Sequence, residues 1–420
     1  MAADDDVLII GGGPVGVCAA YYLADAGCRV TLLERDELCS RYGGAYANAG
    51  LIVPSEVYPL AAPGALGQGL KWLLDSGSPF FIQPRLDPAL WRWLLLFRRA
   101  CAEDRMRPLM PALRALGRRS AELWAELAAA RGKSFGYEQN GWLNLYATEK
   151  GLAAAVAEAA EARALGVAAE VIDARRAREM MPALINGVAG GVFNAENGHV
   201  DPQAFVSELG RRAARKGADI RLATEVIGLR SVGRRVVKVM TTRGDLEAGT
   251  VVLAAGCWSP AIARLTGLKL PIQPAKGYSV TVARPEGFPE LPAYLAEGHV
   301  CITPLGDRLR MAGTLELAGM DMRVRANRVA GIRRGAARFL PALADREALE
   351  IWRGPRPVTP DGLPIVGRSP RHDNLIVAAG HCMLGLSLGP VTGKLVAQLV
   401  TGQAPDVDLE RVRVDRFGLS

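Results

Sequence analysis

The first part of the chain alternates between apolar runs and a glycine-rich turn. Residues 7–10 are an apolar run of strand length, and residues 11–16 are rich in glycine. A run of small and apolar residues follows up to Ala24, and a second apolar run covers residues 30–33. Runs of these lengths in this order predict a strand, a turn, a helix and a second strand, which together form a βαβ unit.

The glycines of the turn have the spacing of a dinucleotide-binding fingerprint. Gly11 permits a tight turn, Gly13 lets the backbone approach a pyrophosphate, and Gly16 lets the helix pack closely on the strand. Pro14 and Val15 follow at the start of the helix, where free amides and the helix dipole favour phosphate. The turn therefore predicts the phosphate-binding part of a dinucleotide site.

An acidic residue ends the second predicted strand. Glu34 follows Gly16 by about 20 residues, the usual offset of the carboxylate that binds ribose hydroxyls. Strand, glycines, helix, strand and acid in this order predict dinucleotide binding. At this point both FAD and NAD fit the pattern.

Later segments alternate between helical and strand patterns. The predicted helices cover residues 111–131, 151–165 and 202–216, and the predicted strands lie within residues 141–147, 220–222, 235–253, 276–282, 300–302, 308–311 and 375–379. We interpret residues 111–131 as a surface helix with arginine and glutamate on its exposed face. The strand-rich region that begins at Lys276 is interpreted as the sheet of a substrate domain.

Residues 90–99 form the most apolar segment within residues 59–131. At helical period this segment is apolar over most of its circumference, with Arg92, Arg98 and Arg99 at the edges. A core helix of a second domain explains this pattern, and we favour that interpretation. A basic amphipathic helix with tryptophan can also lie on a membrane surface. Membrane contact through residues 66–99 is therefore a further hypothesis.

Composition narrows the classes of function. The chain has 420 residues, half of them hydrophobic, and a net charge of +8. No Lys/Arg-rich tract is interleaved with aromatic residues, so we expect no nucleic-acid binding. No apolar run approaches the ~18 residues that span a membrane, and the start of the chain does not resemble a secretory signal. We expect a cytoplasmic protein, at most peripheral on the inner face of the cytoplasmic membrane.

Cysteine and histidine usage argues against a metal site. The seven cysteines are scattered, and the four histidines form no cluster with ligand spacing. We therefore expect reduced thiols and no metal ligand set.

Candidate chemistry gathers in the last part of the chain. Residues 352–367 are rich in proline and glycine, and we interpret them as a rigid loop from which Arg356 or Arg353 presents a guanidinium to a carboxylate. Residues 380–389 form a glycine loop between a buried strand and a helix. We expect the start of that helix to stabilise negative charge on a reduced flavin.

Together these motifs resemble the D-amino-acid oxidase-like FAD oxidoreductases, and within them the bacterial D-amino-acid dehydrogenases. The likeness covers nearly the whole chain. It rests on residues 7–16 with Glu34, Ala47-Asn48-Ala49-Gly50, residues 71–91, Lys276-Gly277-Tyr278-Ser279, residues 356–362, and residues 380–385 with Thr392-Gly393.

The resemblance implies FAD as the cofactor. The implied FAD-binding residues are Gly11, Gly13, Pro14, Val15, Gly16, Glu34, Arg35, Gly43, Gly44, Asn48, Ala49, Gly50, Leu51, Val226, Ala255, Gly256, Trp258, Gly354, Gly380, Met383, Leu384, Gly385, Leu386 and Ser387. The candidate catalytic residues are Arg356, which the resemblance places on the substrate carboxylate, with Tyr278 as a second contact, and His381. This chain has Gly44 and Ala45 where relatives often carry Ser or Thr, which leaves backbone contacts to the cofactor in that loop.

The predicted fold is α/β, with a Rossmann-like FAD-binding domain and a discontinuous antiparallel-sheet substrate domain of α+β type. We assign residues 1–75, 152–272 and 352–420 to the FAD-binding domain. Residues 76–151 and 273–351 are assigned to the substrate domain.

The implied reaction is oxidative deamination of D-amino acids to 2-oxo acids and ammonia, with hydride transfer from Cα to flavin N5. Because only one complete fingerprint is present, electrons are expected to pass to a quinone, another carrier or oxygen rather than to NAD(P). Two alternatives stay open: oxidation of a secondary or small amine acid (D-hydroxyproline, sarcosine or glycine), and a non-catalytic FAD-binding subunit of a larger complex. Side-chain preference, oligomeric state and covalent attachment of FAD are not determined by these motifs.

Overall fold

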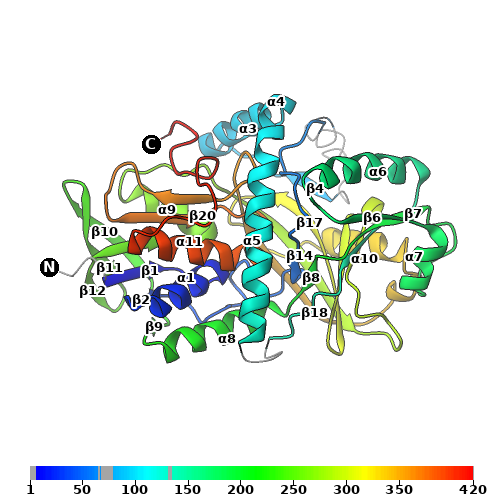
Figure 1. Ribbon diagram of the computed structural model, residues 1–420, viewed down its shortest axis with the longest axis horizontal. Helices are drawn as coiled ribbons and strands as arrows, with labels where there is room; N and C mark the ends of the chain where they lie inside the picture. Colours follow the sequence, from blue (N-terminus) through cyan, green and yellow to red (C-terminus); the bar gives the residue numbers. More distant parts are fainter. Residues whose placement is uncertain (1–5, 65–66, 68–78, 131–134, 420) are drawn as a thin grey trace.

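The computed structural model describes residues 6–64, 67, 79–130 and 135–419. In this part of the chain, one half of the molecule is built on a six-stranded sheet in the order β19-β20-β13-β1-β2-β9 (Figure 1, left). Neighbouring strands are parallel except β19, which is antiparallel to β20. The strands are β1 (Asp6–Ile10), β2 (Arg29–Leu33), β9 (Asp219–Arg221), β13 (Thr250–Leu253), β19 (Ile365–Arg368) and β20 (Leu375–Ala379).

Both faces of this sheet are covered. Successive side chains of a strand point to opposite faces, and in β1 Val7 and Ile9 pack with helices while Leu8 and Ile10 pack with a smaller sheet. The helices are α1 (Pro14–Asp25), α5 (Met110–Ala129), α8 (Pro202–Arg215) and α11 (Gly389–Thr401). The smaller sheet contains β10 (Val226–Val232), β11 (Arg235–Thr241) and β12 (Gly244–Glu247), and α9 (Ser259–Arg264) lies beside it. The predicted Rossmann-like arrangement is confirmed.

The other half is built on a nine-stranded, mostly antiparallel sheet (Figure 1, right). Its order is β18-β14-β17-β16-β15-β5-β7-β6, with β4 beside the end of β17; the β4–β17 and β5–β15 pairs are parallel. The strands are β4 (Phe80–Ile82), β5 (Trp142–Tyr146), β6 (Ala169–Asp173), β7 (Gly190–Asn194), β14 (Gln273–Ala283), β15 (Ala293–Leu295), β16 (Val300–Leu305), β17 (Arg308–Leu317) and β18 (Ala348–Val358). Helices α7 (Ala174–Met180) and α10 (Ala326–Ala337) share a core with one face, and α6 (Glu149–Ala164) packs on β6 and β7.

The structure corrects three of the predicted domain boundaries. Strand β18 of the nine-stranded sheet extends to Val358, although residues 352–420 are assigned to the FAD-binding domain. Strands β6 and β7 belong to the nine-stranded sheet, although residues 152–272 were assigned to the FAD-binding domain. Helix α5 packs with the helices of the six-stranded sheet, although residues 76–151 were assigned to the substrate domain. It crosses the molecule between the two halves (Figure 1). Its buried Trp124 lies 4.2 Å, ring to ring, from Phe205 of α8, so this predicted surface helix has a buried apolar side. An amphipathic pattern shows that a helix has an apolar face, and not which element that face contacts.

Helix α3 (Pro88–Ala100) lies at the edge of the molecule with the short α4 (Glu103–Met106). Asp87 caps α3 by accepting from the amides of Ala89 and Leu90. Trp93 is buried, as expected of a core helix, whereas Trp91 and Leu95 are 58% and 60% exposed. The hypothesis of membrane contact covers residues 66–99. Of these, residues 66 and 68–78 lie outside the described residues.

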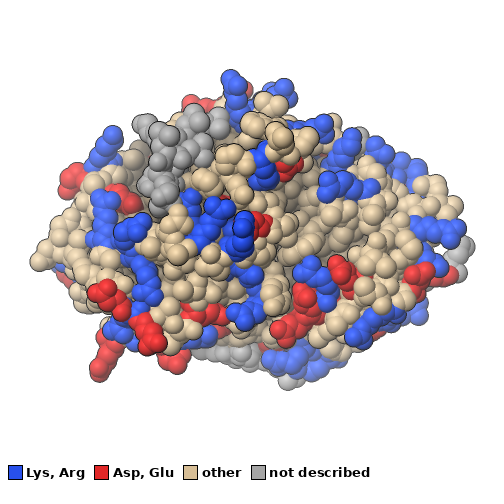
Figure 2. All heavy atoms as spheres, turned by 180° about the vertical axis from the view of Figure 1, so that it is seen from behind, with Lys and Arg blue, Asp and Glu red and all other residues tan. Residues whose placement is uncertain are grey.

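The remaining described elements are short. They are β3 (Leu51–Ile52), β8 (Gly198–His199) and 3₁₀ turns at Arg107–Leu109, Gly256–Trp258, Ala296–Gly298 and Pro341–Leu343. Over the described ranges, no helix combines the length and apolar character needed to cross a bilayer. On the face shown in Figure 2, lysine and arginine side chains form several separate groups with acidic side chains between them.

Candidate cofactor and substrate site

A cavity of about 460 Å³ lies at the carboxyl edge of the parallel sheet. Its walls come from both halves of the molecule: the turn after β1, the end of β2, the loop after it, the turn after β13, strand β18 and the loop after β20. Ligands of open α/β sheets bind at this edge because the loops and helix N-termini gather there.

The glycines after β1 shape one end of the cavity. Gly11 has φ +111°, and a Cβ there would lie 2.6 Å from the carbonyl oxygen of Ala254. A Cβ at Gly16 would overlap the carbonyl of Gly11, so Gly16 supports the turn without lining the cavity. Gly13 is different: a Cβ there meets no described atom within 4 Å, and its φ of −74° is open to any residue. Gly13 therefore faces free space at the N-terminus of α1.

Glu34, which follows β2, lines the same end of the cavity as the glycines after β1. The carboxylate of Glu34 accepts from the amide of Gly12 at 2.6 Å and from the amide of Asp36 at 3.0 Å. The guanidinium of Arg35 lies 4.8 Å from the ring centre of Trp258, across the cavity wall. Sequence separates these two residues widely, and the parallel pairing of β1 with both β2 and β13 brings them together.

The loop after β20 is held by contacts with β18 and α5. His381 bridges to Val358 of β18, and the amide of Cys382 donates to the carbonyl of Pro357 at 3.0 Å. The carbonyl of Ser387 accepts from Trp124 Nε1 of α5 at 3.0 Å. Since this loop leads into α11, these contacts set where the positive end of the α11 dipole lies.

Two predicted residues of this loop have roles other than those expected. The hydroxyl of Ser387 accepts from the amide of Val53 and is buried away from the cavity. His381 lines the cavity, with Nε2 2.9 Å from Thr392 Oγ1. Burial lowers the pKa of His381 to about 3, so this imidazole is neutral at physiological pH and is a poor proton acceptor.

Arg356 lies in the wall of the cavity. The predicted rigid loop at residues 352–367 is in fact strand β18 up to Val358; its prolines are tolerated because β18 is at the sheet edge. Trp352, Gly354 and Arg356 alternate along this strand and all line the cavity. Arg356 Nη1 donates to the carbonyl of Thr314 at 2.7 Å. No described carboxylate forms an ion pair with it, and burial lowers its pKa.

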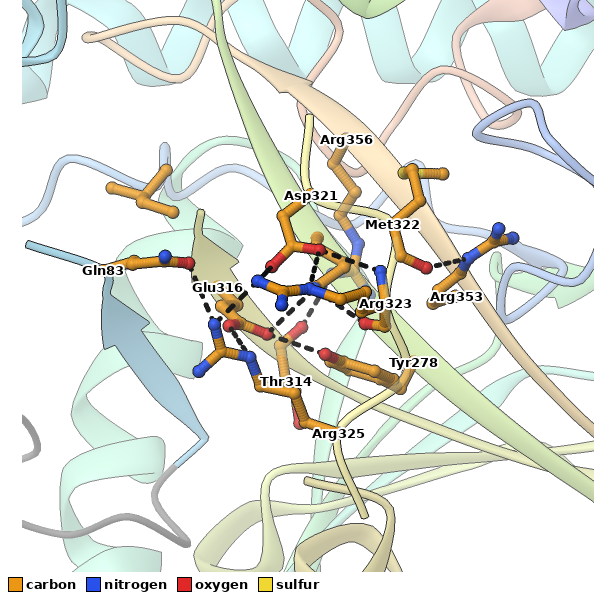
Figure 3. A network of polar contacts seen from close by, with 12 residues as sticks. Gln83, Tyr278, Thr314, Glu316, Asp321, Met322, Arg323, Arg325, Arg353 and Arg356 are labelled. Atoms are coloured by element: carbon orange, nitrogen blue, oxygen red, sulfur yellow. Dashed lines mark hydrogen bonds and ion pairs between the residues drawn. The ribbon is translucent and has the colours of Figure 1, made fainter. Parts of the chain in front are cut away.

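Arg353 occupies the opposite side of β18. It is three positions from Arg356, an odd offset that reverses the face of a strand. Its Nε donates to the carbonyl of Met322 at 2.7 Å, and it points away from Arg356 (Figure 3). Of the two arginines, only Arg356 faces the cavity.

The structure contradicts a substrate contact by Tyr278. This residue is 1% exposed, belongs to the core between the nine-stranded sheet and α10, and does not line the cavity. Its hydroxyl donates to Glu316 Oε2 at 2.7 Å (Figure 3). The alternation along β14 places the side chain of Tyr278 on the face opposite that of the cavity.

The cavity brings together most of the predicted FAD-binding residues. Those that line it are Gly11, Gly13, Pro14, Val15, Glu34, Arg35, Gly43, Gly44, Asn48, Val226, Ala255, Gly256, Trp258, Gly354, Met383, Gly385 and Leu386. Those that lie behind it are Gly16, Ala49, Gly50, Leu51, Gly380, Leu384 and Ser387. Gly50, for example, has φ +72° and contacts the backbone of Val200, so it shapes the 42–52 loop from behind.

Sequence reasoning missed several residues of the wall. Ser40 also lines the cavity, and its hydroxyl accepts from the amide of Tyr42. Trp352 was passed over, although its alternation with Gly354 and Arg356 is a strand signal. Thr224 lines the cavity after β9, which is two strands from β1 in the sheet, and no local pattern indicates it.

Comparison with known proteins decides the family. Residues 6–399 match the DAO family, FAD dependent oxidoreductase. The chain belongs to this family. It is therefore an oxidoreductase, and its cofactor is FAD.

Full-length relatives support the assignment. A D-amino acid dehydrogenase of Methylobacterium nodulans is 36% identical and covers 98% of this chain and 99% of that protein. A D-amino acid dehydrogenase of Xanthobacter autotrophicus is 33% identical with the same coverage. Among solved structures, glycine oxidase from Geobacillus kaustophilus is similar with a TM-score of 0.80, 27% identity and 98% of both chains covered.

The residues of the cavity fit FAD. The free space at Gly13 lies at a helix N-terminus, which suits a pyrophosphate. The carboxylate of Glu34 lies beside it, as ribose recognition requires. Over the described residues, no group of His, Cys, Asp and Glu could hold a metal ion.

Proposed function

We propose that this flavoprotein oxidises D-amino acids to 2-oxo acids and ammonia, with two electrons passed to FAD and one water consumed in hydrolysis of the imino acid. The observation that carries the proposal is Arg356, a guanidinium in the cavity wall without a described carboxylate partner. The full-length relatives named D-amino acid dehydrogenase support the substrate class and its configuration.

Within this proposal, the two ends of the cavity have different tasks. Gly13 and the start of α1 bind the pyrophosphate, and Glu34 binds ribose hydroxyls. Gly354, Met383, Gly385 and the other cavity-lining residues predicted above surround the rest of the cofactor. The start of α11 favours negative charge on the reduced cofactor.

Arg356 is the anchor of the substrate carboxylate. When bound, FAD supplies the acceptor for the hydride from Cα. The chain contributes orientation: a guanidinium that forms two parallel hydrogen bonds with a carboxylate restricts how the substrate lies. His381 stays neutral and is hydrogen-bonded to Thr392, so we assign it a structural role rather than that of a base.

Anaerobic reduction of the purified yellow protein tests this function. We expect D-alanine and other D-amino acids to bleach the flavin absorbance near its visible maximum, and their L-enantiomers to leave it unchanged. Glycine, N-methylglycine and D-hydroxyproline form the second arm of the panel, since glycine oxidase is a structural neighbour. Reduction by these alone would move the substrate class to small or secondary amines. Absence of reduction by every compound would favour a non-catalytic FAD-binding subunit.

A comparison of turnover with a quinone and with oxygen, on the same preparation, identifies the electron acceptor. We propose that the electrons pass to a quinone or another carrier. Turnover with D-alanine and a soluble quinone is expected to exceed turnover with oxygen alone. Faster turnover with oxygen would make the protein an oxidase.

We also propose that α3 contacts an anionic membrane surface. Its exposed side carries Trp91 and Leu95 with Arg92, Arg98 and Arg99, which are all exposed. Basic residues near an anionic surface contribute about 1 kcal/mol each. We expect the protein to sediment with vesicles of phosphatidylglycerol and phosphatidylcholine at low salt and to be released at high salt.

A matched pair of variants tests the surface of α3. The double change Trp91→Ser and Leu95→Ser is expected to abolish sedimentation. The control Leu349→Ser removes an equally exposed leucine, 60% like Leu95, on β18 and should leave sedimentation unchanged. Wild-type protein that stays in the supernatant at low salt would refute membrane contact.

A further inference from the structure

The guanidinium of Arg356 rests on the backbone of the neighbouring strand. Arg356 is opposite Ala275 in the β14–β18 register, and its side chain extends over Gly277. A Cβ at Gly277 would overlap the guanidinium carbon and both terminal nitrogens. On its other side, Nη1 donates to the carbonyl of Thr314. One glycine and one carbonyl therefore determine where the charged group lies.

Thr314 reaches Arg356 because β17 contains a bulge. Tyr278 is opposite Gly313, whereas Lys276 is opposite Glu316, so β17 has one more residue than β14 over this interval. Thr314 has φ +69°, which a β-branched residue rarely adopts. Such a conformation is strained and persists only where the surroundings impose it. Bulges of this kind redirect groups beside active sites.

The buried carboxylate of Glu316 holds the bulge from the opposite face of the sheet. Glu316 is fully buried; its Oε2 accepts from the Tyr278 hydroxyl and lies 3.5 Å from Lys276 Nζ. Its Oε1 lies 3.0 Å from Arg325 Nε (Figure 3). Lys276 and Tyr278 flank Gly277, so one carboxylate binds both neighbours of the residue beneath Arg356.

The chemistry of this network suits a fixed support. A buried carboxylate requires paired donors, and losing one of them is costly. Burial and Glu316 raise the pKa of Tyr278, so its hydroxyl stays protonated and continues to donate. Lys276 Nζ also donates to the carbonyl of Arg323 at 2.9 Å. The ammonium group near Glu316 therefore also holds the loop after β17.

We propose that Glu316 is a positioning residue for Arg356. By binding Tyr278 and Lys276 it maintains the bulge that directs the Thr314 carbonyl to the guanidinium above Gly277. This inference rests on the proposed role of Arg356 as the anchor of the substrate carboxylate. Glu316 does not line the cavity, and it acts through the geometry of two strands.

The preference for D-alanine over D-alaninamide measures this geometry. The two compounds differ in the carboxylate, and a charge-assisted pair of about 1.5–3 kcal/mol corresponds to a roughly 10- to 150-fold preference in kcat/KM. In FAD-loaded Glu316→Gln we expect that preference to fall at least about fivefold, mainly through KM. Gly277→Ala is expected to reduce it as well, because the added methyl displaces the guanidinium directly.

Two further variants separate positioning from general stability. Adding Thr314→Gly to Glu316→Gln is expected to restore part of the preference, since glycine adopts positive φ without strain and the bulge then needs less support. Asp321→Asn removes the partner of Arg323 and Arg325 in the same network, without touching Glu316, and is expected to keep the wild-type preference. Loss of preference in Asp321→Asn would contradict a specific role of Glu316.

Failure of this inference can be told from failure of the proposed function. A wild-type protein that oxidises D-alanine no better than D-alaninamide overturns the anchor role of Arg356 and with it this inference, whereas a wild-type protein that oxidises no D-amino acid overturns the proposed function. Preference that is lost in Arg356→Ala but unchanged in Glu316→Gln overturns only the positioning role. If Glu316→Gln does not fold, Tyr278→Phe removes a single hydroxyl and is expected to lower the preference in the same direction. An unchanged preference in Tyr278→Phe would then overturn the inference.

Discussion

A Gly13→Val variant is expected to fold and to purify without most of its FAD. The backbone of Gly13 has φ −74°, which valine accepts, and a Cβ there meets no described protein atom within 4 Å. The side chain would instead occupy the space that we assign to the pyrophosphate. Placing additional methyl groups where another group must lie costs typically 1–3 kcal/mol. For the valine side chain and the pyrophosphate, this cost corresponds to a loss of about 5- to 150-fold in FAD affinity.

Absorbance measures this outcome directly. The ratio of visible flavin absorbance to protein absorbance should fall in Gly13→Val, while circular dichroism shows an intact fold. Gly16→Val is the contrasting variant, because a Cβ at Gly16 overlaps the carbonyl of Gly11. That variant is expected to lose folded protein as well as FAD. Full FAD content in Gly13→Val would place the pyrophosphate elsewhere.

An Arg356→Ala variant is expected to keep its FAD and to lose most of its activity on D-amino acids. Loss of a charge-assisted contact of about 1.5–3 kcal/mol predicts a roughly 10- to 150-fold fall in kcat/KM, seen chiefly as a higher KM. Arg356→Lys keeps the charge but not the planar fork, and should recover only part of the loss. Steady-state kinetics with D-alanine gives these values.

Arg353→Ala is the matched control for Arg356→Ala. Arg353 is on the same strand but on the opposite face, where it donates to the carbonyl of Met322. We expect the kcat/KM of Arg353→Ala to stay within about threefold of the wild type, since Arg353 does not line the cavity. Normal kinetics in Arg356→Ala, with loss in Arg353→Ala, would move the carboxylate anchor to Arg353.

The FAD-binding half was readable from sequence because its signals are local. Gly11 and Gly13 lie in the turn before α1, Gly16 lies in the first turn of that helix, and Glu34 directly follows β2. Each is required by backbone geometry within a single βαβ unit, so spacing alone carries the information. The residues beyond that unit were named through the resemblance, and the cavity gathers most of them from distant parts of the chain.

The domain boundaries were less readable for a different reason. Helix α5 and strands β6 and β7 have the expected local patterns, but the partners that they pack against are distant in sequence. Trp124 of α5 packs with Phe205 and hydrogen-bonds to Ser387. Periodicity shows that a side of an element is apolar; it carries no information about which surface covers that side.

The sequence by itself determined a Rossmann-like FAD site and directed attention to the arginines of residues 352–367. The residues alone left both arginines open, and the family resemblance favoured Arg356. The tertiary structure supplies the physical reason, because β18 turns Arg356 toward the cavity and Arg353 away from it. The tertiary structure also places Tyr278 away from the cavity, where its hydroxyl donates to Glu316. We therefore assign Tyr278 to the network that supports Arg356, and not to the substrate. The physical reason is that a fingerprint depends on neighbouring residues in one βαβ unit, whereas the position of a guanidinium depends on strand register and on a bulge whose partners lie far apart in the chain.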